Sequence, residues 1–230
     1  MKKIIIITGA SRGVGKFLFD KFTQLGEEVY GTYNRTNPGR PQPNGHFTQV
    51  DILNYSEVEN WIGNIKMIND IILINCAGIT YNSFAHKTDV ELWKNVVDVN
   101  LIGTYNVIRA VLPFMRENNF GRIINFSSVA AQKGTPGISA YAASKAALWG
   151  MTKSIAIENA SKGITINCIN LGYSELGMIG LVPEAFLASI KNQIPSGELC
   201  SQEDIFKTVE YILDTAYLNG TSIDLNGGLI

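Results

Sequence analysis

The stretch Thr8-Gly9-Ala10-Ser11-Arg12-Gly13-Val14-Gly15 follows the apolar run Ile4–Ile7 and leads directly into a segment with helical periodicity. A strand, a glycine-rich turn and a helix in this order are typical of the unit that binds a dinucleotide pyrophosphate. Small residues let the backbone approach the pyrophosphate, and free N–H groups at the start of the helix bind it. Glycine-rich turns also occur simply to reverse the chain, and the G-x-x-x-G-x-G spacing differs from the G-x-G-x-x-G of many such domains.

Short apolar runs alternate with helical segments along the whole chain. Runs that are apolar on both faces are typical of a parallel sheet covered by helices. We predict strands at Ile4–Ile7, Val29–Tyr33, Phe47–Val50, Ile71–Ile74, Ile123–Phe126, Ile164–Ile169 and Ser222–Leu225, and helices at about 14–25, 56–65, 89–117, 139–160 and 202–214. The pattern predicts a single α/β domain over residues 1–230, with a doubly wound (Rossmann) fold around a seven-stranded parallel sheet.

Composition and charge disfavour several classes of protein. The 230 residues carry 19 Lys and Arg against 20 Asp and Glu, so no long-range field attracts a polyanion, and we expect no nucleic-acid partner. The three Cys and two His lie far apart in the sequence, which predicts no metal site. No run approaches the roughly 18 apolar residues of a membrane span. Sparse cysteines fit a reducing compartment, so we expect a cytoplasmic protein with no membrane partner.

The end of the second predicted strand indicates which dinucleotide is bound. Many dinucleotide sites place an acidic residue about 20 residues beyond the glycine loop, where it binds the ribose hydroxyls. Here that place reads Tyr33-Asn34-Arg35 and carries no carboxylate. Guanidinium groups at Arg12 and Arg35 suit a 2′-phosphate, which favours NADP(H) over NAD(H), although Arg35 could also merely solvate a loop. Asp51, after the third strand, either accepts a hydrogen bond from the adenine amino group or caps the following helix.

Tyr141 and Lys145 are four residues apart on a predicted helix, so both side chains project from one face. A phenol ordinarily ionises near pH 10, and a close ammonium stabilises its phenolate, so Tyr141 could exchange a proton nearer neutral pH. Such pairs also arise by chance on helices. Ser127 and Ser128 end the preceding strand, where the ligand crevice of a doubly wound sheet lies and where a hydroxyl can polarise a substrate oxygen.

These motifs occur in the order and spacing of the short-chain dehydrogenases/reductases, and the whole chain resembles that family, especially its β-ketoacyl-acyl-carrier-protein reductases. The shared motifs are Thr8–Gly15, Asn75-Cys76-Ala77-Gly78, Val99-Asn100, Ser128, Tyr141-x-x-x-Lys145 and Asn226-Gly227-Gly228. The resemblance implies reduction of a small-molecule carbonyl, or oxidation of the matching secondary alcohol, by hydride transfer with a nicotinamide cofactor. The alternative is a dinucleotide-binding regulatory or assembly protein with weak or no catalysis.

The resemblance also implies roles for individual residues. Tyr141 is the general acid/base, and Ser128 polarises the carbonyl, with Ser127 as the less favoured neighbour. Lys145 holds the nicotinamide ribose and lowers the pKa of Tyr141. Asn100 supports a water that links Lys145 to solvent, in preference to standing mid-helix without a role. The expected cofactor-binding residues are Gly9, Ser11, Arg12, Gly13, Val14, Gly15, Asn34, Arg35, Asp51, Ile52, Asn75, Ala77, Gly78, Tyr141, Lys145, Gly172 and Ser174.

The chain departs from the family pattern at three positions. Cys76 stands beside Ala77 where the family usually has Asn, and this small residue should keep the turn with fewer side-chain hydrogen bonds. After the sixth strand, Leu171 replaces a Pro. Leu176 replaces the Thr that holds the nicotinamide carboxamide, so the carboxamide needs Ser174, backbone groups or water instead.

Residues near 173–200 should form a short lid over the substrate, with a helix between Pro183 and Pro195. Lys191 would either meet an anionic substrate or face solvent. The family resemblance implies a homotetramer or homodimer built across the helices that carry Asn100 and Tyr141. The apolar lid residues could line a substrate pocket, pack on the body or pack on a neighbouring subunit: Met178, Ile179, Leu181, Val182, Phe186, Leu187 and Ile190.

Overall fold

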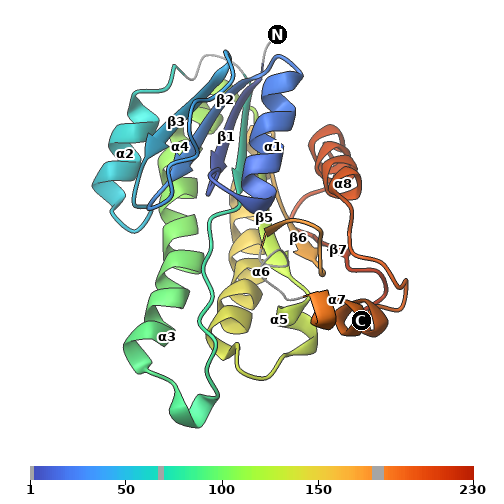
Figure 1. The fold of residues 1–230 in the computed structure, drawn as a ribbon. Coiled ribbons are helices and arrows are strands. Elements are labelled where there is room, and N and C mark those ends of the chain that lie inside the picture. Colours follow the sequence, from blue (N-terminus) through green and yellow to red (C-terminus); the bar gives the residue numbers. More distant parts are fainter. Residues whose placement is uncertain (1–2, 67–69, 178–183) are drawn as a thin grey trace.

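The computed structural model describes residues 3–66, 70–177 and 184–230, and these form a central sheet between two layers of helices (Figure 1). The sheet has seven strands, all parallel, in the order β3-β2-β1-β4-β5-β6-β7. This confirms the predicted doubly wound α/β fold and all seven predicted strands. Their bounds are β1 Ile4–Thr8, β2 Glu28–Tyr33, β3 Gly45–Gln49, β4 Ile71–Asn75, β5 Gly121–Ser128, β6 Ile164–Leu171 and β7 Ser222–Leu225.

Helices cover both faces of the sheet. On one face lie α1 (Gly13–Gln24) and α8 (Gln202–Asp214), and on the other lie α2 (Tyr55–Gly63), α4 (Thr104–Asn118) and α6 (Ser139–Asn159) (Figure 1). Strand β1 shows why the runs are apolar throughout: Ile4 and Ile6 join the core beneath α2 and α4, while Ile5 and Ile7 join the core beneath α1 and α8.

The remaining helical elements are α3 (Val90–Val97), α5 (Ala130–Lys133), α7 (Glu184–Gln193) and the single turns η1 (Ala85–Lys87) and η3 (Ala160–Lys162). The helix predicted before Pro195 is α7. Residues 178–183 of the predicted lid, together with the side chain of Phe186, lie outside the described structure, and they include Met178, Ile179, Leu181, Val182 and Pro183.

The predicted continuous helix over 89–117 is wrong in its middle. A π-helical segment, η2 (Asp98–Gly103), separates α3 from α4. A π turn accommodates more residues than an α turn and therefore changes which side chains face inward. It turns Asn100 into the interior, where it is 0% exposed. It also brings Gly103 against Ile52, where any Cβ would lie 2.7 Å from the Ile52 side chain.

A row of polar side chains crosses the sheet close to the carboxyl ends of the strands. Thr8, Asn75, Asn125 and Cys168 share one register position on β1, β4, β5 and β6. Asn75 Nδ2 donates to Asn125 Oδ1 at 2.9 Å, and Asn125 Nδ2 donates to Thr152 Oγ1 of α6 at 3.0 Å. All five residues are buried. Because buried polar groups need their partners, this row fixes where α6 lies against the sheet.

Candidate active site

The glycine-rich loop packs directly on the turn that follows β4. Gly9 has φ +67°, and a Cβ there would lie 2.7 Å from the Ala77 Cα, so only glycine fits. The Ala77 N–H donates to Thr8 Oγ1 at 3.2 Å, which ties this turn to the end of β1. On its other side the loop meets the segment after β6, since a Cβ on Gly13 would lie 3.2 Å from the Gly177 Cα. Sequence reasoning missed this second contact.

The start of α1 fits a pyrophosphate. Arg12 is the N-cap residue, its backbone is extended, and its side chain makes no capping hydrogen bond. The first N–H groups of a helix have no intrahelical acceptor and, with the helix dipole, bind phosphate oxygens. Ser11 and Val14 are half-buried and Gly15 is buried, so the loop is small and compact at this point. The residues present therefore suit a dinucleotide.

The four residues predicted to be catalytic converge where β5, α6 and η2 meet. Lys145 Nζ lies 5.7 Å from the centre of the Tyr141 ring on α6. Ser128, the last residue of β5, interacts with Tyr141 through its hydroxyl. A Cβ on Gly78 would lie 3.2 Å from Asn100 Oδ1 and 3.5 Å from Lys145 Nζ, so the glycine leaves room beside both groups.

Burial is the largest influence on the pKa values of Lys145 and Tyr141. It lowers the pKa of Lys145 to about 8, against an opposing effect of Cys76 and Cys168. Lys145 Nζ donates to the Phe126 carbonyl at 2.7 Å. Burial also raises the pKa of Tyr141, and the hydrogen bond with Ser128 lowers it by less. The pKa of Tyr141 therefore lies above its ordinary value in this structure, because desolvation of the phenol outweighs the hydrogen bond with Ser128, and the effect of Lys145 on this pKa stays a prediction.

Asn100 is held by three side-chain hydrogen bonds. The Ile79 N–H donates to Asn100 Oδ1 at 2.8 Å, and Asn100 Nδ2 donates to the Ile79 carbonyl and to Ser144 Oγ, each at 3.0 Å. Ser144 Oγ donates onward to the Tyr141 carbonyl at 2.8 Å. The amide thus joins the turn after β4 to the helix that carries Tyr141. The water-holding role of Asn100 stays a prediction.

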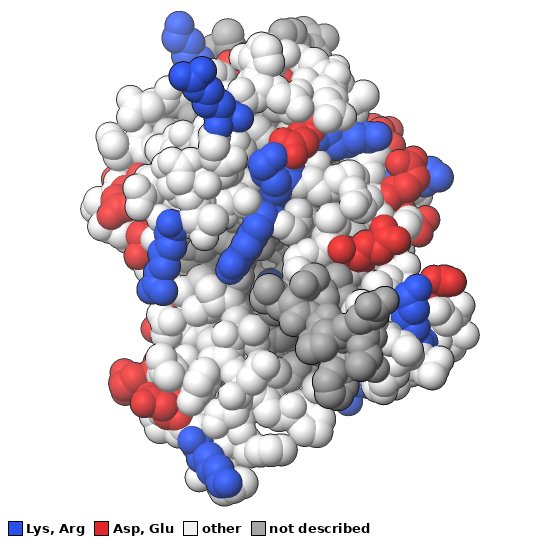
Figure 2. All heavy atoms as spheres, in the orientation of Figure 1, with Lys and Arg blue, Asp and Glu red and all other residues white. Residues whose placement is uncertain are grey.

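The two arginines predicted to contact the 2′-phosphate lie at the surface, as does Asn34, another predicted cofactor-binding residue. Arg12, Asn34 and Arg35 are all exposed. In the parts of the chain that the structure describes, neither Arg12 nor Arg35 forms an ion pair with an acidic side chain. Figure 2 shows Lys and Arg side chains in the middle and along the upper left of this face.

Asp51 does not cap α2. Asn54 is the N-cap residue, and its side chain accepts a hydrogen bond from the Glu57 N–H. Asp51 Oδ1 instead accepts from the Leu53 N–H at 3.0 Å, within the turn that joins β3 to α2. Of the two roles predicted for Asp51, helix capping is therefore wrong, and adenine binding stays a prediction. Ile52 is buried against η2.

The segment after β6 is tightly folded at its start. A Cβ on Gly172 would lie 2.8 Å from the Asn226 Cα, so β6 and the end of the chain meet through backbone. Ser174 Oγ donates to the Leu176 carbonyl at 3.1 Å, and Ser174 pairs with Cys200 in an isolated bridge. The side chain of Leu176 packs against the core beneath α1 and α8. The hydroxyl of Ser174 therefore forms its hydrogen bond within the turn that contains Ser174 and Leu176.

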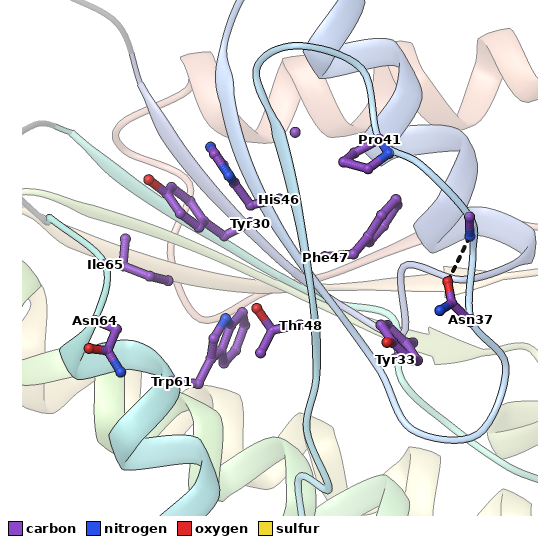
Figure 3. A pocket seen from close by; sticks show the side chains of 12 residues that line it. Tyr30, Tyr33, Asn37, Pro41, His46, Phe47, Thr48, Trp61, Asn64 and Ile65 are labelled. Carbon is purple, nitrogen blue, oxygen red and sulfur yellow. Dashed lines mark hydrogen bonds between the residues drawn. The ribbon is translucent and has the colours of Figure 1, made fainter.

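A hollow of about 540 Å³ lies away from these residues, beside the edge strand β3 and the end of α2 (Figure 3). Tyr33, Phe47 and Trp61 are among its lining residues, and none of the four predicted catalytic residues is. The Trp61 Nε1 is buried and has no partner among the described residues. The hollow follows the open edge of the sheet, so it is not the predicted active site.

The parts of the chain that the structure describes hold no group of three or more His, Cys, Asp or Glu side chains placed to bind a metal ion. No helix among these same residues is long and apolar enough to cross a bilayer.

The family model described as short chain dehydrogenase matches residues 3–184. This chain belongs to that family. It is therefore an oxidoreductase that acts on a carbonyl or alcohol group with a nicotinamide dinucleotide cofactor.

Individual relatives are similar to this short-chain dehydrogenase over 99% of its chain. It is 33% identical to the acetoacetyl-CoA reductase of Shinella zoogloeoides, covering 99% of this chain and 98% of that one. It is 32% identical, with the same coverage, to the 3-oxoacyl-[acyl-carrier-protein] reductase FabG of Haemophilus influenzae. Ligand-free aldohexose dehydrogenase of Thermoplasma acidophilum superposes with a TM-score of 0.90 at 27% identity, covering 99% of this chain and 94% of that one.

Proposed function

We propose that this short-chain dehydrogenase is an NADP(H)-dependent carbonyl reductase, or dehydrogenase of the matching secondary alcohol, with Tyr141 as general acid/base. One observation carries the proposal: Asn100, Ser128, Tyr141 and Lys145 converge at the carboxyl ends of the strands, beside the space that Gly78 leaves open. Ligands of doubly wound sheets bind at this edge.

The protonation states suit carbonyl reduction. When bound, the nicotinamide supplies the hydride. Burial raises the pKa of Tyr141, so the phenol is protonated at neutral pH and can give its proton to the substrate oxygen. Ser128 Oγ, beside it, donates a hydrogen bond to the same oxygen. The pKa of Lys145 is about 8, so its ammonium is charged at pH 7 and stabilises the negative charge that develops on Tyr141.

The dinucleotide would lie along the loop and the strand ends. Gly9, Gly13 and the first N–H groups of α1 would bind the pyrophosphate, together with Ser11, Val14 and Gly15. Lys145 and Tyr141 would hold the nicotinamide ribose in the space beside Gly78. The Asn75 side chain belongs to the polar row across the sheet, so Asn75 and Ala77 would contribute through their backbone. Asp51 and Ile52 would border the adenine, and Gly172 and Ser174 the nicotinamide.

Two exposed cations support NADP(H) over NAD(H). The end of β2 offers the Asn34 amide and the Arg35 guanidinium where NAD sites usually place a carboxylate, and Arg12 lies at the start of α1. Guanidinium groups match phosphate oxygens in geometry and charge, so both suit a 2′-phosphate.

The printed activities of the relatives indicate which substrates to test. Acetoacetyl-CoA reductase and 3-oxoacyl-[acyl-carrier-protein] reductase are full-length matches above 30% identity, which favours a 3-oxoacyl thioester. The close structural match to an aldohexose dehydrogenase, at lower identity, makes an aldose the second candidate.

Steady-state kinetics test the function directly. Oxidation of NADPH with acetoacetyl-CoA, and reduction of NADP⁺ with glucose, should be compared for the wild type and Tyr141→Phe. We expect turnover with acetoacetyl-CoA that falls at least about a hundredfold in the variant, because general acid catalysis contributes on that order. Unchanged turnover removes Tyr141 from its role. Tight binding of NADPH without turnover of any carbonyl would support the regulatory or assembly alternative.

We also propose that the enzyme is cytoplasmic and forms a homotetramer or homodimer. All three cysteines are free thiols, as a reducing compartment favours. Ile102, Tyr105 and Ile157 are large apolar side chains exposed on η2, α4 and α6, the elements expected at the subunit interface. Light scattering gives the mass, and a monomeric mass would contradict the proposed assembly.

A further inference from the structure

A second polar row lies two residues nearer the carboxyl ends of the strands than the first. Ser127, Asn170 and Asp224 share one register position on β5, β6 and β7, three neighbouring strands (Figure 1). One carboxylate oxygen, Asp224 Oδ1, accepts from Asn170 Nδ2 at 2.6 Å and from Gln132 Nε2 of α5 at 2.8 Å. Asp224 therefore contacts both the neighbouring strand and the short helix that begins two residues after Ser128.

Trp149 carries this row to the helix of Tyr141 and Lys145. Its Nε1–H donates to Asn170 Oδ1 at 2.8 Å and to Ser127 Oγ at 3.0 Å. Ser127 Oγ in turn donates to the Lys145 carbonyl at 2.9 Å. Because an indole N–H can only donate, Ser127 must use its own proton toward Lys145. Ser127 is thus committed to the helix, which leaves Ser128 as the hydroxyl for substrate.

Asp224 fixes which way the Asn170 amide points. The two ends of an amide have nearly the same shape, so their hydrogen-bond partners decide the orientation. A carboxylate only accepts, which places Asn170 Nδ2 toward Asp224 and Asn170 Oδ1 toward Trp149. The opposite orientation would set the amide N–H against the indole N–H and an amide oxygen against a carboxylate oxygen. Each hydrogen bond between Asp224 and Lys145 therefore has only one possible donor and one possible acceptor.

We propose that Asp224 is a positioning residue for the reaction, acting through Asn170, Trp149 and Ser127 on the backbone of Lys145. Through Gln132 the same carboxylate also holds α5 on the Ser128 side of the site. The proposal rests on the proposed reductase function. Precise placement matters for the rate, because small displacements of catalytic groups are costly.

The test compares Asp224→Ala, Asp224→Asn, Trp149→Phe and the double variant Asp224→Ala/Trp149→Phe with the wild type, using acetoacetyl-CoA and NADPH well below the melting temperature. Asp224→Ala should lower kcat about tenfold with KM for NADPH within about twofold, because the placement of Lys145 and α5 changes while the pyrophosphate site at the start of α1 does not. The alkaline limb of its kcat–pH profile should move to higher pH, since a Lys145 that is held less tightly is less desolvated, which raises its pKa toward the ordinary value. Asp224→Asn keeps an acceptor oxygen and should restore kcat to within about threefold.

The double variant tests whether the chain acts as a unit. Its kcat should be no lower than the kcat of the less active of the two single variants, because both substitutions break the same chain of hydrogen bonds. The indole N–H resonance of Trp149, identified by its loss in Trp149→Phe, should shift upfield in Asp224→Ala. Asp214→Ala removes an exposed carboxylate at the end of α8 and serves as the matched control, with all readouts unchanged.

Two results would overturn the proposal while the proposed function stands. One is an active wild type whose kcat and pH profile survive Asp224→Ala, even with a lower melting temperature, since the carboxylate is then structural only. The other is additive effects of the two single substitutions. A wild type that turns over no carbonyl refutes the proposed function itself, and the positioning role falls with it.

Discussion

Replacing Thr152 by Val should destabilise the protein, whereas the same replacement at Thr165 should stabilise it. Both threonines are buried, at 1% and 5% exposure. They differ in their hydrogen bonds. Thr152 Oγ1 accepts from Asn125 Nδ2 at 3.0 Å and lies 3.2 Å from Cys168 Sγ. Thr165 Oγ1 is buried and has no partner in the described structure. Valine has nearly the same shape as threonine but lacks the hydroxyl, so the pair isolates the value of these hydrogen bonds.

The magnitudes follow from what each substitution leaves behind. Thr152→Val leaves Asn125 Nδ2 buried without an acceptor, which should lower the free energy of unfolding by about 2 kcal/mol. Thr165→Val removes an unpaired hydroxyl and should raise the free energy of unfolding by about 1 kcal/mol. For a chain of this size, about 2–4 °C of melting temperature corresponds to each kcal/mol.

Equilibrium unfolding in urea measures both variants. The protein concentration must be the same throughout, because assembly of subunits makes the midpoint concentration-dependent. Equal m-values would show that the midpoints report stability alone. Midpoints that move in the same direction for both variants would refute the reasoning, since packing and not hydrogen bonding would then control these positions.

Three further predictions concern the site. The pKa of Lys145 is about 8 in the folded protein and 10.5 when the side chain is not buried, as in the unfolded chain. Between these two pH values the unfolded chain binds more protons than the folded protein, so the contribution of Lys145 to stability rises with pH across that window. The urea midpoint of the wild type minus that of Lys145→Met should therefore rise from pH 7 to 10, and a flat difference contradicts the burial of Lys145. Arg35→Ala should lower kcat/KM for NADPH at least about tenfold and leave that for NADH within about threefold, whereas equal losses would exclude a 2′-phosphate contact. Gly9→Ala should abolish cofactor binding measured by NADPH fluorescence, because its Cβ would meet the Ala77 backbone, while Gly150→Ala on α6, where a Cβ meets nothing within 4 Å, should bind normally and gain about 0.5–1 kcal/mol in the free energy of unfolding.

The strands were predictable because each is apolar on both faces and bounded by turn residues. Ile4 to Ile7 is the clearest case, with alternate residues in the two cores. The glycine-rich loop was predictable because Gly9 and Gly13 are needed for positive φ and close backbone approach. The proximity of Tyr141 and Lys145 was predictable from their spacing of four residues on one helix. In each case the signal is local in the sequence.

What was missed depends on contacts between distant segments. The π turn around Asn100 replaces α-helical hydrogen bonds, and nothing in the local periodicity requires it. The contact of Gly13 with Gly177 joins two loops 164 residues apart. The pKa of Tyr141 depends on a balance between its burial and its neighbours, and a sequence shows the neighbours but not the burial. Asn54, not Asp51, caps α2 because the helix begins at Tyr55 and the side chain of the residue directly before it accepts from the Glu57 N–H.

The helix α6 unites these observations. Three polar contacts hold it at different heights: Ser144 to Asn100, Trp149 to Ser127 and Asn170, and Thr152 to Asn125. Apolar packing is non-directional and would tolerate a small rotation of the helix about its axis. Hydrogen bonds to fixed partners on β5, β6 and η2 do not, because each has a preferred distance and angle. A helix that, in the proposed function, must keep the Tyr141 phenol and the Lys145 ammonium at fixed positions therefore gains from polar residues on its buried face, where an ordinary core helix would carry apolar ones.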